Sequence, residues 1–194
     1  MGLAGKKVDC RCLVVLAHIE ESLHLYVHNR MFFRVASKPH TIKGPSDWVD
    51  EQSVLTAMHL VTNKDSNDNQ RPLLAPDYKV IAQMEKDYGF NWSEQVLPKI
   101  YILLTELFRG MTEAYPAMKS ASNSRALYGI DIIFDAKDSP FIEPKLTEVS
   151  FCPSNNALAI EAYEKDQELF DNFSNNLFEC LVCGITSPNM TQLF

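Results

Sequence analysis

The sequence predicts an α/β domain, in the broad sense that includes α+β folds, in which a mixed or antiparallel sheet packs against two or three helices. Three patterns favour this class: alternating apolar positions near the N-terminus, two long stretches of helical spacing, and two apolar strand-like runs between them. The chain has 194 residues, of which 46% are hydrophobic, so it can build one core of ordinary size but not two enzymatic domains.

The first strands are predicted from alternation and from an apolar run. Residues 8–18 end in that run, residues 22–28 alternate apolar and polar positions, and residues 29–36 continue after a short turn. We expect these segments to form three antiparallel strands, and residues 56–63 favour a further short one. Residues 64–77 are polar, rich in Asn and Asp and contain two prolines, which predicts a flexible internal loop.

Helical spacing of apolar residues marks the second half of the chain. Residues 78–88 predict one helix, and a longer helix with a wide apolar face follows Ser93, which we expect to be its N-cap. A last helix is predicted from about residue 156 to residue 183, where Gly184 would end it. Residues 184–194 form a polar tail that we expect to fray.

Charge and hydropathy exclude some classes of partner. The formal net charge is −7, whereas proteins that bind nucleic acids usually present a basic surface, so we expect no nucleic-acid partner. No apolar run reaches 18 residues, and the N-terminus is too short and polar for a signal peptide, so we expect no membrane partner. These observations together predict a cytoplasmic protein.

The five cysteines favour free thiols over a metal site. Cys180 and Cys183 form a CxxC pair in an apolar helical stretch, but no second CxxC exists and the histidines lie far away in the sequence. We therefore expect buried or half-exposed thiols, with metal, redox and disulfide roles as the alternatives.

The most informative chemical feature is a carboxylate within each of two neighbouring strand-like segments. Asp131 lies in residues 125–135, Glu148 lies in residues 141–151, and a turn between these segments would bring the two side chains together. Burying a carboxylate is costly unless it is paired or binds a metal, and Mg²⁺ prefers a few carboxylate oxygens with phosphate and water. The pair therefore favours a nucleotide–Mg²⁺ site. The alternatives are that Asp131 pairs with a buried arginine or faces solvent at a strand edge.

Basic residues on the first strand could face that acidic pair. Lys7, Asp9 and Arg11 alternate, so their side chains point to one face of the strand, and Arg34 could join them from an adjacent strand. Cations facing an acidic pair are suited to holding a phosphoryl group. The alternative is a solvated strand face with an ion pair between Asp9 and Arg11.

Five segments occur in an order and spacing that match a known family. They are KVDCR at 7–11, FFRVAS at 32–37, AMHLVTN at 57–63, YGIDIIFD at 128–135 and LTEVSFCPS at 146–154. Together they resemble the C-terminal half of the tubulin–tyrosine ligase-like family, which has the ATP-grasp fold, and most of all a divergent branch of it. The resemblance covers residues 6–183 and implies an ATP-grasp-like C-terminal lobe that is incomplete relative to the full fold.

The resemblance implies roles for individual residues. It places Lys7, Asp9, Thr62 and Asn63 at the ATP site, Arg11 and Arg34 on phosphate and the acyl-phosphate or amino-acid substrate as catalytic residues, and Asp131 and Glu148 on Mg²⁺. Family members activate a protein carboxylate with ATP and let an amino acid attack it. The implied cofactors of the complete protein are ATP and Mg²⁺, and the implied partner is tubulin or another acidic protein.

Two departures from the family pattern favour an alternative function. Ser150 stands where the family has an asparagine that helps to bind metal and nucleotide, so we expect weaker Mg²⁺ binding. The chain also begins at the KVDCR strand, so we expect the upstream lobe to be missing and the isolated 194 residues to be inactive. The alternative is a catalytically inactive pseudoenzyme that acts as a protein-interaction or regulatory module.

Overall fold

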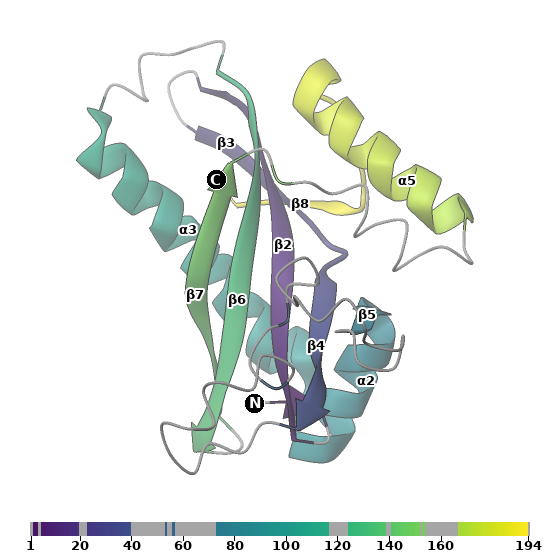
Figure 1. The fold of residues 1–194 in the computed structure, drawn as a ribbon. Helices are drawn as coiled ribbons and strands as arrows, with labels where there is room; N and C mark the ends of the chain where they lie inside the picture. The colour runs from purple at the N-terminus through teal and green to yellow at the C-terminus, as the bar shows by residue number, and fades with distance from the viewer. Residues whose placement is uncertain are drawn as a thin grey trace.

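The computed structural model confirms the predicted fold class. It describes residues 2–3, 5–19, 23–39, 53, 56, 73–116, 124–138, 141–151, 153 and 167–193. Within these residues, eight strands form one sheet whose registered pairs are all antiparallel, and three α-helices pack against it (Figure 1). No helix in these ranges is long and apolar enough to cross a membrane.

The elements follow the predicted order along the chain. The strands are β1 (Gly2–Leu3), β2 (Lys6–Ile19), β3 (Leu23–His28), β4 (Phe32–Pro39), β5 (Leu73–Pro76), β6 (Ala126–Asp138), β7 (Phe141–Phe151) and β8 (Met190–Gln192). The helices are α2 (Asp77–Tyr88), α3 (Leu97–Ala114) and α5 (Gln167–Phe178), and two π-helical turns, η4 (Trp92–Val96) and η6 (Glu179–Cys183), adjoin α3 and α5.

Strand β2 is the centre of the sheet. It pairs with β6 along one side, while β3 and β4 share its other side: β3 pairs with its C-terminal half and β4 with its N-terminal half. The three expected strands are confirmed, but β3 and β4 do not each pair with the whole of β2: they lie one after the other along the same side of it. They are separate strands because the four residues 28–31 between their paired positions lie opposite only residues 12–13 of β2.

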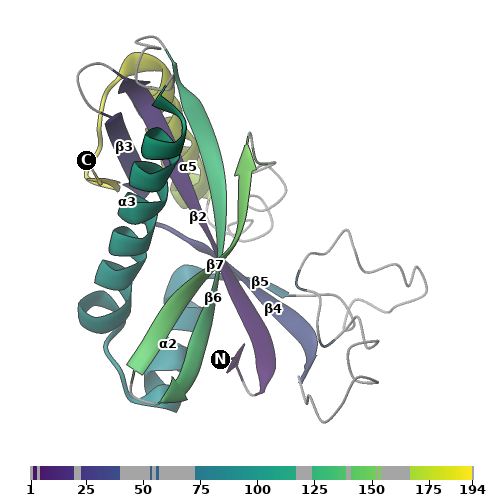
Figure 2. The same cartoon turned by 90° about the vertical axis from the view of Figure 1, so that its left-hand side faces the viewer.

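The two faces of the sheet are covered differently. One face of β2, including Cys12 and Val14, packs with α2 and α3 in the main apolar core. The other face, including Leu13 and Val15, packs against α5 and η6 in a smaller core. Figures 1 and 2 show α3 and α5 on opposite faces of the sheet, and α5 crosses only one end of it. The face that α5 leaves open carries Lys7, Asp9 and Arg11 of β2.

Two segments that we expected to be irregular are strands. Residues 73–76, within the expected loop 64–77, form β5 beside β4, and α2 begins at Asp77; residues 64–72 lie outside the described part. The expected tail contains β8, which pairs with β3 and buries Met190. Long-range pairing supplies the hydrogen bonds in both cases, so the local sequence carried little signal.

Helix boundaries also differ in detail. The helical segment before α3 is capped by Asn91, whose side chain accepts a hydrogen bond from the backbone N–H of Glu94, whereas we expected Ser93. Ser93 instead donates its hydroxyl to Asn91. The last helix is confirmed from Gln167, since residues 154–166 lie outside the described ranges, and so does most of the strand expected at 56–63.

Two glycines are expected to respond to alanine with opposite signs. Gly184 ends η6 with φ +68°, a left-handed conformation that strains any side chain, so Gly184→Ala should lower the free energy of unfolding by about 1 kcal/mol. Gly110 lies exposed within α3 with open space around it, so Gly110→Ala should raise that free energy by about 0.5–1 kcal/mol. Urea denaturation of both variants tests this expectation, and equal shifts would contradict it.

Candidate functional site

Four charged side chains meet on the open face of the sheet. Asp9 on β2 lies directly opposite Arg34 on β4, and Arg11 on β2 lies directly opposite Asp131 on β6. Directly opposite residues share a face, and residues two apart on one strand do as well, so the register brings all four together. We call Asp9, Arg11, Arg34 and Asp131 the charged cluster.

The charged cluster is joined by a continuous chain of hydrogen bonds. Arg11 donates from Nε to Asp131 Oδ1 at 2.7 Å and from Nη2 to Asp131 Oδ2 at 2.8 Å, a two-point contact. Arg34 donates from Nη2 to Asp131 Oδ2 at 2.7 Å and from Nε to Asp9 Oδ1 at 2.5 Å. The hydroxyl of Thr56 donates to Asp9 Oδ2. Arg34 therefore bridges the two carboxylates.

Burial makes these contacts stronger than surface ion pairs. Only 5–12% of each side chain of the cluster is exposed. Burial alone would raise the pKa of Asp131, but the hydrogen bonds and positive charges of Arg11 and Arg34 outweigh it and lower that pKa below the ordinary value. Burial alone would lower the pKa of Arg34, and the charges of Asp9 and Asp131 raise it instead. Arg34 and Asp131 therefore both stay charged at neutral pH.

These contacts decide between alternatives that the sequence left open. Asp9 pairs with Arg34 and not with Arg11, and Asp131 pairs with two buried arginines. The pairing of Asp131 with arginine was the alternative to its metal role. The metal role stays a prediction, because Asp131 Oδ1 accepts one hydrogen bond, from Arg11 Nε, and keeps a further lone pair for a cation, whereas Oδ2 accepts two.

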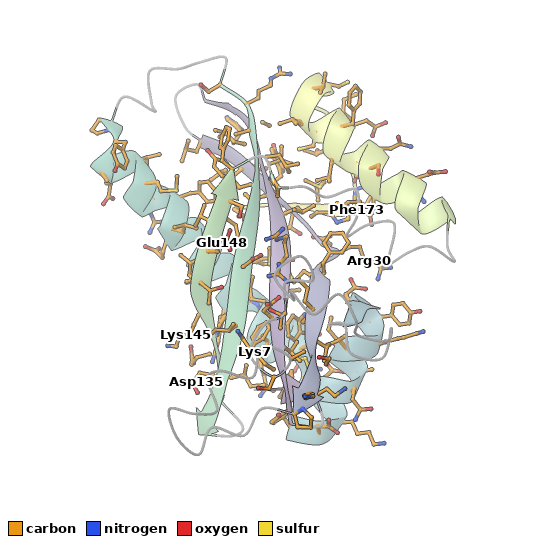
Figure 3. The ribbon with its side chains drawn as sticks, viewed as in Figure 1. Lys7, Arg30, Asp135, Lys145, Glu148 and Phe173 are labelled. Atoms are coloured by element: carbon orange, nitrogen blue, oxygen red, sulfur yellow. The ribbon has the colours of Figure 1, made fainter. Side chains whose placement is uncertain are left out.

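Strand β7 adds the second predicted metal ligand. Glu148 lies directly opposite Asp131, and a bulge at Thr147 separates this pair from the next, in which Leu146 lies opposite Ile132. The Thr147 hydroxyl donates to the Asp131 carbonyl oxygen at 2.9 Å, which holds the bulge in place. Glu148 is exposed, and Figure 3 shows it on the face of the sheet that α5 leaves open.

The side chain of Ser150 forms a hydrogen bond with Glu148 and with no other site residue in the described part of the chain. Its hydroxyl donates to Glu148 Oε1 at 2.6 Å, and its backbone lies opposite Gly129. Within the described ranges, no hydrogen bond reaches Glu148 Oε2. Ser150 therefore orients the carboxylate of Glu148, a contact that the sequence did not reveal.

The remaining predicted site residues are placed unequally. Lys7 lies on β2, half-buried, on the same side of the strand as Asp9 (Figure 3). Thr62 and Asn63 lie outside the described residues. Thr56 was missed, because it lies 47 positions from Asp9 in the sequence and just before the AMHLVTN segment, in which only Thr62 and Asn63 were assigned to the site.

The donor set fits a Mg²⁺ ion that is shared with phosphate. Asp131 and Glu148 offer two carboxylates on facing strands, which matches the one or two carboxylates that Mg²⁺ usually takes from protein. Within the described ranges, no group of three His, Cys, Asp or Glu side chains could hold an ion by itself. Phosphate oxygens and water would have to complete the coordination.

The cysteines of the described residues are all free thiols. Cys10, Cys12 and Cys180 are buried, as expected, whereas Cys183 is exposed and Cys152 lies outside the described part. Burial raises the pKa of Cys180 to about 11, so this thiol is poorly suited to redox chemistry at neutral pH.

Comparison with known proteins identifies the family. The profile of the tubulin-tyrosine ligase family matches residues 2–190, which include every strand and helix that builds the site. The chain belongs to this family. Membership confirms the resemblance drawn from the five sequence segments, and it agrees with the α/β lobe that the structure shows.

Two curated proteins match this chain at low sequence identity. Tubulin–tyrosine ligase-like protein 12 of Caenorhabditis elegans is 25% identical over 185 residues, which cover 94% of this chain and 25% of that protein. Tubulin glycylase 3F of Tetrahymena thermophila is 24% identical over 177 residues, which cover 91% of this chain and 18% of that protein. The chain thus spans about a quarter or less of the relatives that it matches.

Proposed function

We propose that this chain forms the C-terminal part of a site that uses ATP and Mg²⁺ to ligate an amino acid to a protein carboxylate. The observation that supports it is the charged cluster: two nearly buried guanidinium groups held side by side on one face of the sheet. Membership of a ligase family supports the same reaction class.

The two arginines are suited to an anionic ligand. A guanidinium has five N–H donors, and within the described residues Arg11 and Arg34 each spend two of them on carboxylates. The remaining donors could bind a phosphoryl or carboxylate oxygen in a geometry that Asp131 and Asp9 hold fixed. Such preorganised donors stabilise negative charge that develops during phosphoryl and acyl transfer.

Asp131 and Glu148 would hold Mg²⁺, with Ser150 orienting Glu148. When bound, the ion would neutralise phosphate charge between these carboxylates and the arginines. Lys7 would add a positive charge near the nucleotide, and Asp9 would fix the orientation of Arg34. The part of the chain that contains Thr62 and Asn63 would complete the nucleotide site.

Tubulin or another acidic protein is the proposed acceptor, and the cytoplasm the proposed location. The names of both curated relatives refer to tubulin, and one of them is a glycylase. A carboxylate-rich acceptor segment is also the chemistry that paired guanidinium groups recognise.

A second candidate function is a pseudoenzyme that binds protein without ligation. Ser150 favours it, since a serine hydroxyl bonded to Glu148 replaces the family asparagine. The engagement of both Asp131 oxygens by arginine favours it as well, because a Mg²⁺ ion there would lie close to two positive charges.

Calorimetric titration with MgATP of the complete protein, in which an upstream lobe accompanies these 194 residues, tests the proposed site. Arg11→Gln is expected to weaken MgATP binding about ten- to a hundredfold, because it removes a charged donor pair. Arg109→Gln is the matched control, since Arg109 lies exposed on α3 and forms an ion pair with Glu106 on the same helix. Circular dichroism of each variant checks that the fold is retained.

The outcomes separate the two candidate functions. Equal MgATP affinities for the two variants would contradict the proposed nucleotide site. If Arg11→Gln weakens binding, mass spectrometry of a glutamate-rich tubulin-tail peptide, incubated with ATP and amino acids, decides the rest. An ATP-dependent mass increase supports ligation, and an unchanged peptide supports the pseudoenzyme.

A further inference from the structure

Gly129 leaves a notch in the face of the sheet beside the charged cluster. It lies on β6 two residues before Asp131, so it faces the same side, and it is buried. A side chain at this position would place its Cβ 2.8 Å from Cβ of Pro153 and 3.5 Å from Cδ of Arg11. Carbon atoms do not approach to 2.8 Å, so the ring of Pro153 occupies space that only glycine leaves open.

The same notch borders the stem of Arg11. Cδ is the atom bonded to Nε, and Nε donates the 2.7 Å hydrogen bond to Asp131 Oδ1. The ring of Pro153 and this carbon border the same notch, so the ring narrows the space into which the guanidinium could swing away from Asp131. Pro153 is well suited to this contact, because its ring is rigid and its backbone has a fixed φ.

We infer that Gly129 and Pro153 are positioning residues for Arg11. The ring of Pro153 fills the notch and limits the movement of the Arg11 side chain on that side. The guanidinium therefore stays hydrogen-bonded to Asp131, and its remaining N–H donors keep a fixed orientation. The inference deepens the proposed function and rests on it for its effect on ligand binding. The contact itself is a property of the ligand-free protein and can be measured there.

An alanine at position 129 separates this role from a direct clash with Arg11. The new methyl group would lie 3.5 Å from Arg11 Cδ, an ordinary van der Waals distance, so Arg11 is not displaced directly. Strand β6 is held between β2 and β7, so Pro153 is the part that has to move. Gly129→Ala is therefore expected to displace the ring of Pro153, so that the guanidinium of Arg11 can rotate away from Asp131.

Hydrogen exchange of the arginine Nε–H groups measures the effect. In ¹⁵N spectra of the ligand-free protein, Gly129→Ala is expected to speed exchange at Arg11 Nε–H at least about tenfold, as its charge-assisted hydrogen bond opens more often. Arg34 Nε–H, which bonds to Asp9, is the internal reference and should stay unchanged. Pro153→Ala should act in the same direction, and Gly110→Ala, on the exposed side of α3, should change neither signal.

Each outcome bears on the inference. Acceleration at Arg11 alone, in both Gly129→Ala and Pro153→Ala, supports it. An unchanged Arg11 signal overturns it, and so does equal acceleration at Arg11 and Arg34, which would indicate general loosening. If exchange at Arg11 Nε–H is faster in Gly129→Ala but not in Pro153→Ala, the ring of Pro153 does not restrain Arg11 and the inference is wrong. Should Gly129→Ala fail to fold, Pro153→Ala alone decides.

A ligand titration distinguishes this inference from the proposed function. If MgATP binds the wild-type protein, and Gly129→Ala both weakens that binding and speeds exchange at Arg11 Nε–H, the proposed nucleotide site and the positioning role are both supported. If Arg11 exchange responds while MgATP fails to bind the wild-type protein, the positioning role stands and the proposed nucleotide site does not. If MgATP binds equally well to both proteins and exchange is unchanged, the positioning role alone fails.

Discussion

Arg34→Met is expected to lower the free energy of unfolding by about 3–5 kcal/mol, because it leaves buried carboxylates without their bridging cation. Arg34 joins Asp9 to Asp131, and its side chain is only 10% exposed. Without it, Asp9 keeps the hydroxyl of Thr56 and Asp131 keeps Arg11, so the cluster carries one excess negative charge. Urea denaturation at pH 7 measures the loss.

Two comparisons show whether charge burial causes that loss. Arg109→Met removes an exposed arginine paired with Glu106 and should change the free energy of unfolding by no more than about 0.5 kcal/mol. Adding Asp9→Asn to Arg34→Met removes the excess charge, so the double variant should be more stable than Arg34→Met alone. A double variant with additive losses would contradict the proposed coupling.

The pH dependence of Arg34→Met gives an independent check. An unpaired buried carboxylate has a raised pKa, so it binds a proton in the folded state before it does so in the unfolded state. The deficit of the variant relative to the wild-type protein should therefore shrink as the pH falls from 7 to 5. A deficit that is constant over this range would point to lost packing of the arginine stem instead.

The second large effect concerns His28, which is expected to make the fold acid-sensitive. His28 ends β3, is 1% exposed, packs edge-on against Phe173 with 4.6 Å between ring centroids, and accepts a hydrogen bond from the Arg30 N–H at Nδ1. Its Nε2 has no partner among the described residues. Burial, together with the charge of Arg30, lowers the pKa of His28 from 6.5 to about 4.

The direction of the acid effect follows from that shift. Between pH 6.5 and pH 4 the unfolded chain binds a proton at His28 and the folded protein does not, so stability falls as the pH falls. The full loss over this window is about 3 kcal/mol, since each pKa unit corresponds to about 1.4 kcal/mol. Asp131, whose pKa lies below its ordinary value of 3.8, loses its stabilising contacts only below this window.

Denaturation at a series of pH values from 4 to 7.5 tests the role of His28. His28→Phe keeps an aromatic ring against Phe173 and removes the titrating group, so the slope of stability against pH should flatten. The loss of the acceptor for the Arg30 N–H should cost this variant about 1 kcal/mol at every pH. A wild-type slope in His28→Phe would contradict the assignment.

Much of the site could be anticipated from the sequence because strand geometry is periodic. Alternation alone places Asp9 and Arg11 on one face of β2, and a carboxylate in each of two adjacent strands suggested that Asp131 and Glu148 meet. The register confirms that these two residues are direct neighbours. The helices α2 and α3 followed from apolar spacing with similar reliability, since that spacing is local.

The sequence by itself thus determined the fold class, the family and the set of charged residues on one strand face. Only the tertiary structure decided that Arg34 bridges Asp9 and Asp131, that Thr56 joins them, and that β5 and β8 are strands. Periodicity is a property of neighbours in the chain. Pairing depends on the register between segments far apart in the chain, 120 positions apart for Arg11 and Asp131, and no local pattern encodes that register.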